Sequence, residues 1–185
     1  MHFLFILTLA GSLLTAAASH SAPAPNPPEE SASVLPELKL LDRIGEVGSQ
    51  VEASASQLVT DALGFLGVPY RRGGNSAETG FDCSGLVRTL YEQTTGLLLP
   101  RKASDQAAAT EKIDKKELQP GDLVFFNTMR RAFSHVGIYI GNGKFVHAPK
   151  PGGEVRVEDL GAPYWTKRFD GARRVPTGND NGPQK

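Results

Sequence analysis

Apolar residues recur at helical spacing in two stretches of the first part of the chain. Residues 37–52 carry them three or four positions apart, which favours a helix that Gly45 and Gly48 weaken. A firmer helix is predicted for residues 56–66, with Ser56 as its N-cap and Gly67 as its stop. We therefore expect a helix to begin at Ser56, preceded by a looser helical segment.

The helical period returns after a Gly-rich loop that runs from Tyr70 to Gly80. One helix is predicted for residues 82–95, with Gly96 as its terminator, and a shorter one for residues 103–110.

After Pro120 the apolar period changes from helical to strand-like. Asn142 and Gly143 are a strong hairpin signal because both residue types tolerate positive φ. Helices followed by antiparallel strands predict an α+β domain, with N-terminal helices packed on an antiparallel sheet of about five strands. The predicted strands are residues 122–127, 135–140, 144–147, 154–157 and 169–175.

The ends of the chain differ in composition from its centre. Residues 3–18 form an apolar run that ends in small residues, as in a signal peptide. The alternative, a membrane anchor, is weaker because a span needs roughly 18 or more apolar residues. The predicted organisation is a signal peptide at 1–22, a Pro/Ala/Ser-rich linker at 23–36, a helical extension at 37–55, one folded domain at 56–175 and a disordered tail at 176–185.

Net charge limits the class of partner. Lys plus Arg and Asp plus Glu both number 20, so the formal net charge is zero. Nucleic acid is therefore not an expected partner, and recognition of any polymer has to come from a specific cleft.

Cys83 is the single cysteine, so no internal disulfide can form. Most free cysteines are small buried hydrophobic residues. Cys83, however, is expected in the first turn of a helix, where free backbone N–H groups and the helix dipole favour a thiolate and should lower its pKa. The same N–H groups suit an oxyanion.

Two histidines fall in the predicted fold, and both lie on the hairpin. His135 opens one strand and His147 closes the other, so their rings are expected to meet if they share a face. A thiol, a first histidine as base and a second to orient it form a nucleophile–base–orienter set. A zinc site is the rival interpretation, but one Cys and two His give only three ligands without the usual spacing.

Several linked motifs follow one another along the chain. They are Tyr70-Arg71-Arg72-Gly73-Gly74, Phe81-Asp82-Cys83-Ser84-Gly85-Leu86-Val87, Gly121-Asp122-Leu123-Val124-Phe125-Phe126, His135-Val136-Gly137-Ile138-Tyr139-Ile140-Gly141 and Phe145-Val146-His147-Ala148. In these motifs and in their order, the chain resembles the NlpC/P60 family of cell-wall cysteine peptidases over residues 56–175.

The resemblance implies a papain-like α+β fold with a catalytic triad of Cys83, His135 and His147. It implies hydrolysis of the bond between γ-D-glutamate and a diamino acid, expected to be meso-diaminopimelate, in peptidoglycan stem peptides. Tyr70 resembles a tyrosine that faces the catalytic cysteine and helps to polarise the substrate carbonyl, while Asp82 and Ser84 flank the substrate cleft. Loop packing for Tyr70, and helix capping for Asp82 and Ser84, are the structural alternatives.

The remaining expectations concern partners and rival functions. No cofactor, metal or stable membrane anchor is expected, and the protein is expected to be an exported monomer in the periplasm or outside the cell. Two other classes stay open: a papain-like wall amidase or acyltransferase, and a non-catalytic peptidoglycan-binding module.

Overall fold

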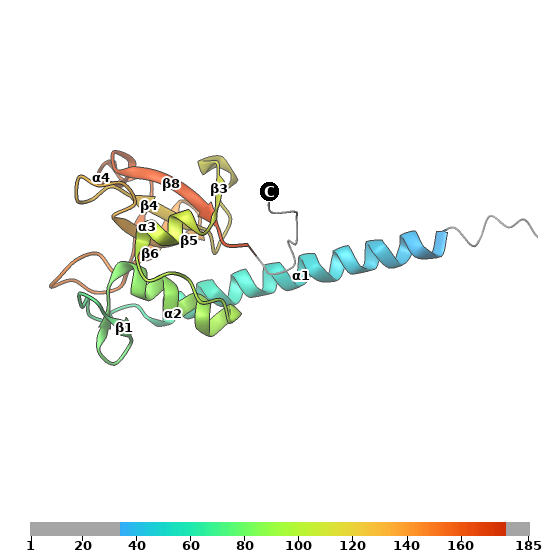
Figure 1. Cartoon of the computed structure of the whole chain (residues 1–185), viewed down its shortest axis with the longest axis horizontal. Helices are drawn as coiled ribbons and strands as arrows, with labels where there is room; N and C mark the ends of the chain where they lie inside the picture. The colour runs from blue at the N-terminus through green and yellow to red at the C-terminus, as the bar shows by residue number, and fades with distance from the viewer. Residues whose placement is uncertain (1–33, 177–185) are drawn as a thin grey trace, which may run out of the picture. The chain divides into compact units, whose positions relative to one another are not determined.

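The computed structural model describes residues 34–176 of the chain. The predicted signal peptide, residues 23–33 of the predicted linker and the tail after residue 176 lie outside the described residues. The chain divides into two units, residues 1–39 and 40–185. The sheet and the cleft described below belong to the second unit (Figure 1).

Helix α1, Val34–Gly64, is one continuous helix of 31 residues. The prediction that a helix begins at Ser56 is therefore wrong, because Ser56 lies inside α1, where its carbonyl accepts a hydrogen bond from Thr60 Oγ1 at 2.9 Å. No Pro interrupts residues 37–64, and interior glycines cost only about 1 kcal/mol each, so the two helical stretches join. Leu58 and Ala62 are fully buried and fix the last turns of α1 to the domain.

The main sheet has six strands in the order β3-β8-β4-β5-β6-β7, all antiparallel. The α+β prediction is confirmed, and the sheet has one strand more than expected. The extra strand, β3, is only three residues long and pairs with β8, some 60 positions later. The strands are β3 Glu111–Ile113, β4 Leu123–Phe126, β5 His135–Gly141, β6 Lys144–His147, β7 Arg156–Asp159 and β8 Phe169–Arg174.

Shorter elements complete the domain. Helix α2 ends, as predicted, at Gly96, whose φ of 74° places it in the left-handed region. The other elements are β1 Asn75–Ser76, β2 Gly80–Phe81, α2 Cys83–Thr95, α3 Ala103–Ala108, a single 3₁₀ turn at Lys115–Glu117, and α4 Pro163–Thr166.

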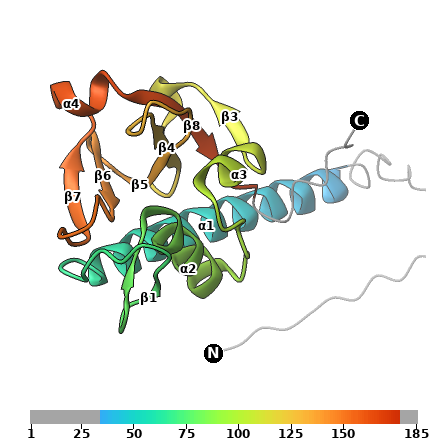
Figure 2. The same cartoon turned by 60° about the vertical axis from the view of Figure 1, so that its left-hand side comes forward.

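The sheet separates two hydrophobic clusters. One face packs against α1 and α2, which lie on the same side of the sheet (Figure 2). Leu86, Leu90 and Val136 are buried in that cluster. The other face is covered by a smaller aromatic cluster built around Phe126, Phe145 and Trp165. Both faces of the sheet are thus buried at β4 and at the first half of β5.

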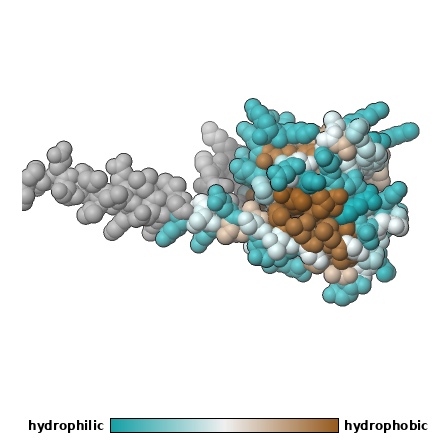
Figure 3. Space-filling view, turned by 180° about the vertical axis from the view of Figure 1, so that it is seen from behind, coloured by the Kyte–Doolittle hydropathy of each residue, from teal (hydrophilic) through white to brown (hydrophobic). Residues whose placement is uncertain are grey.

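The surface of the domain also carries apolar side chains. Leu63 and Leu66, at the end of α1, are 39% and 44% exposed. One face of the molecule bears a patch of apolar side chains framed by polar ones (Figure 3). Among the residues that the structure describes, no helix is both long enough and apolar enough to cross a membrane.

Candidate active site

Cys83 is the first residue of α2. Asp82 is the N-cap, with extended backbone angles, and its Oδ1 accepts a hydrogen bond from the N–H of Gly85 at 2.8 Å. A side-chain oxygen at this position satisfies one of the N–H groups that a helix start leaves unpaired. The cap therefore fixes the turn that presents the thiol, as predicted from the sequence.

Arg101 holds the Asp82 carboxylate from the other side. Its NH1 and NH2 donate to Oδ1 and Oδ2 of Asp82 at 2.9 and 2.6 Å. The N–H of Gly73 donates to Oδ2 at 2.9 Å and ties down the Gly-rich loop. Burial opposes ionisation of Asp82, but the hydrogen bonds from Arg101 and Gly85 outweigh it and hold its pKa below the usual value. No local sequence signal had identified Arg101.

Ser84 belongs to the same cluster. Its hydroxyl accepts a hydrogen bond from Arg101 NH1 at 2.9 Å and lies 3.4 Å from Asp82 Oδ1. The side chain is buried, with 7% exposure. The contacts of Asp82 and Ser84 thus serve the start of α2, in line with the capping alternative.

Gly85 and Gly74 let the loop lie directly on α2. A Cβ on Gly85 would stand 2.0 Å from the carbonyl oxygen of Gly74, and one on Gly74 would stand 2.2 Å from that of Gly80. The Gly74 carbonyl also accepts the N–H of Asp82 at 3.2 Å. Gly74 and Gly85 are therefore required for close backbone packing beside the thiol.

His135 and His147 meet on the face of the sheet that Trp165 covers. Nε2 of His135 is 2.7 Å from Nδ1 of His147. His135 is 4% exposed and His147 is fully buried. Trp165 stacks on the His135 ring with the ring centroids 5.6 Å apart. The predicted meeting of the two rings is therefore seen in the structure.

The hairpin brings the two histidines together along a diagonal. The turn at Asn142 and Gly143 has positive φ at both residues, as predicted, but the register shifts between Tyr139 and Gly141. Ile138 then pairs with Val146, so that His147 stands opposite Gly137, two positions from His135. The rings meet diagonally, over the position where Gly137 carries no side chain.

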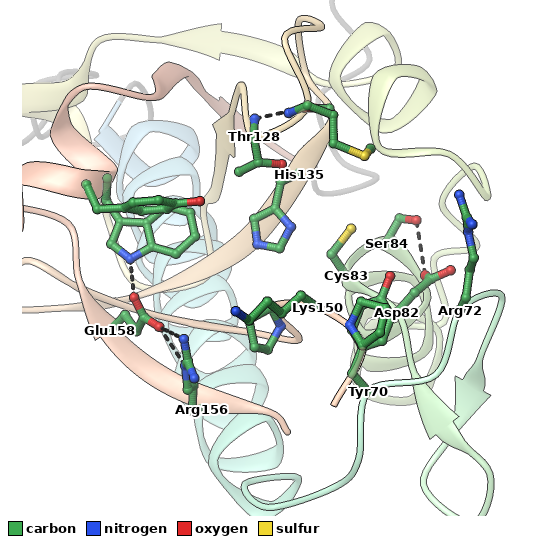
Figure 4. Close-up of a pocket in the computed structure, with 16 residues that line it drawn as sticks. Tyr70, Arg72, Asp82, Cys83, Ser84, Thr128, His135, Lys150, Arg156 and Glu158 are labelled. Atoms are coloured by element: carbon green, nitrogen blue, oxygen red, sulfur yellow. Dashed lines mark hydrogen bonds and ion pairs between the residues drawn. The ribbon is translucent and has the colours of Figure 1, made fainter. Parts of the chain in front are cut away.

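The thiol and the histidine pair face one cleft. Figure 4 shows the Cys83 sulfur on the side of the His135 ring, with the Tyr70 hydroxyl below it. His147 is not among the residues that line this cleft. The cleft has a volume of about 600 Å³, and its lining includes Tyr70, Asp82, Cys83, Ser84, His135 and Glu158.

Burial controls the protonation of the thiol. It raises the pKa of Cys83 and outweighs the backbone N–H groups of Val136 and Ser84, which lower it. The expectation of a lowered pKa is therefore wrong for the thiol as it stands, because a lone thiolate loses more solvation than the helix start returns.

The histidines are neutral for the same reason. Burial lowers the pKa of His135 and of His147 to about 3, and the two rings also disfavour a second charge beside the first. Neither the thiol nor an imidazole is thus stable as an isolated ion. A proton passed from Cys83 to His135 creates both charges at once as a neighbouring pair.

Tyr70 is held in place by the backbone. Its N–H donates to the carbonyl of Gly153 at 2.8 Å, and it forms a bridge with Phe81. Burial raises the pKa of the phenol, and the negative forms of Cys83 and Asp82 raise it further. The hydroxyl is therefore a protonated donor at neutral pH.

The structure offers no alternative metal centre among residues 34–176. No group of three or more His, Cys, Asp or Glu side chains in that part of the chain is arranged to hold a metal ion.

The sequence of this chain is similar to those of known proteins, and the similarity covers the residues of the cleft. The sequence model of the NlpC/P60 family matches residues 67–174. The chain is 40% identical over 132 residues to the murein DD-endopeptidase MepH of Escherichia coli, covering 70% of this chain and 49% of that protein. It is 42% identical over 118 residues to the gamma-DL-glutamyl hydrolase of Bacillus subtilis, covering 63% and 28%.

A solved structure shows the same family similarity. A protein of the NLP/P60 family from Staphylococcus aureus, described as similar to a lipoprotein, has a TM-score of 0.59 and 42% identity over 65% of this chain and 41% of its own. The matched region thus spans about half or less of the length of these similar proteins.

Proposed function

The chain belongs to the NlpC/P60 family, and on that basis we propose that it is a cysteine endopeptidase that hydrolyses peptidoglycan stem peptides. The observation that carries the proposal is the His135–His147 contact of 2.7 Å beside a thiol at a helix start. Cys83 is the proposed nucleophile, His135 its base, and His147 the residue that orients His135.

The first half of the proposed reaction forms a thioester. His135 accepts the thiol proton, and the Cys83 sulfur attacks the amide carbonyl carbon, whose electron pair moves to oxygen. The Cys83 N–H and the Tyr70 hydroxyl are proposed to hold that oxyanion. His135 then gives its proton to the leaving amine, and the carbon–nitrogen bond breaks.

The second half of the proposed reaction hydrolyses the thioester and regenerates the free enzyme. Water attacks the thioester carbonyl while His135 accepts a proton from it. The carbon–sulfur bond breaks, the acid product leaves, and His135 returns a proton to the Cys83 sulfur. No cofactor takes part in either half.

Basic side chains around the cleft suit a substrate that carries carboxylates. Arg72 and Lys150 both line the cleft. Asp82 and Ser84 are proposed to act by holding the start of α2 and Arg101, since their hydrogen bonds go there.

The bond proposed is the one between γ-D-glutamate and the diamino acid, expected to be diaminopimelate. The Bacillus relative, a gamma-DL-glutamyl hydrolase, supports this choice. The Escherichia relative is a DD-endopeptidase and favours a second candidate, a bond between two D-configured centres. The Escherichia relative is a murein endopeptidase, which supports a wall peptide as the substrate. Because the net charge is zero, recognition of that substrate is left to the cleft.

An exported location follows from the same proposal. Wall peptides lie outside the cytoplasmic membrane, and the apolar run at residues 3–18 suits a signal peptide. We propose that the mature protein acts as a monomer in the periplasm or outside the cell.

The test is digestion of purified muropeptides with the wild type and with Cys83→Ala, read by mass spectrometry. New termini at γ-D-glutamate, formed by the wild type alone, would support both nucleophile and bond. If the products are cut only at the DD bond, the second candidate bond is supported and the γ-D-glutamyl bond is ruled out. No product from any muropeptide would refute the endopeptidase proposal and favour an acyltransferase or a binding module.

A further inference from the structure

Glu158 lies behind the histidine pair, on the strand next to the one that carries His147. Its Oε1 is 3.4 Å from Nε2 of His147. That nitrogen is buried and has no hydrogen-bond partner with good geometry among the described residues. A buried imidazole N–H needs an acceptor, and Glu158 is the one within reach.

Two further side chains contact the Glu158 carboxylate. Oε1 accepts a hydrogen bond from Nε of Arg156 at 2.6 Å, and Oε2 accepts one from Nε1 of Trp165. Figure 4 shows Glu158 and Arg156 joined on the side of the cleft away from Cys83. Trp165 also stacks on His135 and meets the His147 ring edge-on, with centroids 5.0 Å apart. The residue that orients Glu158 therefore also sets the plane of His135.

These contacts select one tautomer for each ring. A neutral imidazole has a single N–H. If Nε2 of His147 donates to Glu158, its Nδ1 is free to accept the Nε2–H of His135 across the 2.7 Å contact. His135 then has its lone pair on Nδ1, the ring nitrogen that remains for the thiol.

We propose that Glu158 is a positioning residue that fixes the tautomer of His147 and, through it, keeps the basic nitrogen of His135 directed at Cys83. The inference rests on the proposed function of that pair. When the thiol proton moves to His135, the Nε2–H of the imidazolium donates to His147, and Glu158 stays ionised while its charge stabilises the cation.

The rival explanation is an ion pair of Glu158 with Arg156 that serves only the surface. Arg156 is close to the same ring, and its charge lowers the pKa of His147. The negative charge of Glu158, by contrast, raises the pKa of His135. Loss of Glu158 should therefore harm the His135 imidazolium, whereas loss of Arg156 should not. The other titratable or charged groups around the thiol and the rings are Tyr70, Arg72, Asp82, Arg101 and Lys150.

The experiment compares Glu158→Gln with Arg156→Gln in the full chain. Gln keeps the size of Glu and an oxygen for Trp165 but has no charge. Glu92→Gln is the matched control, because Glu92 is exposed on α2 and outside the cleft. Three quantities are measured: the pH midpoint of Cys83 alkylation by iodoacetamide, kcat and KM on a defined muropeptide, and the melting temperature.

Glu158→Gln should raise the alkylation midpoint and lower kcat about 10- to 100-fold with little change in KM, as for other partners that orient a reactive histidine. Arg156→Gln should leave the midpoint unchanged or lower it, and Glu92→Gln should match the wild type. An unchanged midpoint in Glu158→Gln would overturn the proposal. The proposal would also be overturned if kcat fell equally in the Glu158 and Arg156 variants and in proportion to their loss of melting temperature.

The alkylation arm needs no wall substrate, so the two proposals fail separately. A wild type that cleaves no muropeptide, with a midpoint that still depends on Glu158, would refute the substrate and keep the positioning role. A wild type that cleaves muropeptides, with an alkylation midpoint that does not depend on Glu158, would refute the positioning role alone.

Discussion

Gly137 stands opposite His147 in the β5–β6 hairpin and leaves the space through which the His147 ring reaches His135. A Cβ at Gly137 would lie 2.7 Å from a ring carbon of Phe145 and 3.2 Å from the Cβ of His147. The neighbours at this position are a packed aromatic ring and the backbone of Val146, which cannot move freely.

Gly137→Ala should therefore destabilise the domain and displace His147. The expected loss in the free energy of unfolding is about 1–3 kcal/mol, as for other overpacked cores. Urea unfolding measures it, together with the rate of muropeptide cleavage. Gly48→Ala is the control, because its Cβ would meet nothing within 4 Å and a helix gains from Ala there. Equal stability of the Gly137 variant and the wild type would contradict the packing argument.

Asp82→Asn should separate charge from capping. Asn is also a good N-cap, so this variant loses mainly the ion pair with Arg101, whereas Asp82→Ala loses both. We expect Asp82→Ala to lose about 1–2 kcal/mol of unfolding free energy at pH 7, and Asp82→Asn less, because Arg101 is partly exposed.

The pH dependence of that loss has a defined sign. The folded-state pKa of Asp82 is lowered, so its charge stabilises the fold above the ordinary carboxyl pKa, and the effect disappears as pH falls through the folded value. The difference between the wild type and Asp82→Asn should therefore shrink in acid. A gap that stays constant from pH 7 to pH 3 would show that the charge of Asp82 is not its source.

The buried histidines predict a loss of stability in acid. Their folded-state pKa values of about 3 lie below the ordinary value, so the unfolded chain binds more protons as pH falls from about 6.5. Unfolding free energy should then be greatest above that pH and should fall toward pH 3. His147→Gln removes one such group and should reduce the slope by up to about 1.4 kcal/mol per pH unit. An unaltered slope would mean that His147 titrates normally in the fold.

Tyr70→Phe should slow catalysis without loosening the fold. The variant keeps the ring and the backbone hydrogen bonds but removes the hydroxyl beside Cys83. Loss of one oxyanion donor predicts a fall in kcat of about 10²-fold, with the melting temperature preserved. A kcat equal to that of the wild type would mean that Tyr70 serves only to pack the loop.

Local signals predicted the parts of this molecule that depend on neighbours in sequence. The start of α2 at Asp82 and the turn at Asn142–Gly143 are set by capping and by positive φ, both of which can be inferred from a few residues. Ser56 carries the same kind of cap signal, but an uninterrupted helical run on both sides overrode it.

Long-range contacts account for what sequence alone did not reveal. Strand β3 exists because β8 pairs with it, and three residues are too few to carry a recognisable alternation. Arg101 reaches Asp82 across 19 positions, and Glu158 reaches His147 from an adjacent strand. The bulge that moves His147 opposite Gly137 likewise leaves no mark in the spacing of the two histidines.

Alkylation of Cys83 across pH, compared between the wild type and His135→Ala, tests the central claim most directly. Burial makes a lone thiolate unfavourable, so the reactive form should be the thiolate paired with protonated His135. The wild type is predicted to react faster than His135→Ala at neutral pH, because only the wild type can hold the thiolate beside an imidazolium, while His135→Ala reacts only above the ordinary thiol pKa of about 8.5. If the two proteins give the same rate profile, His135 is not the base of Cys83.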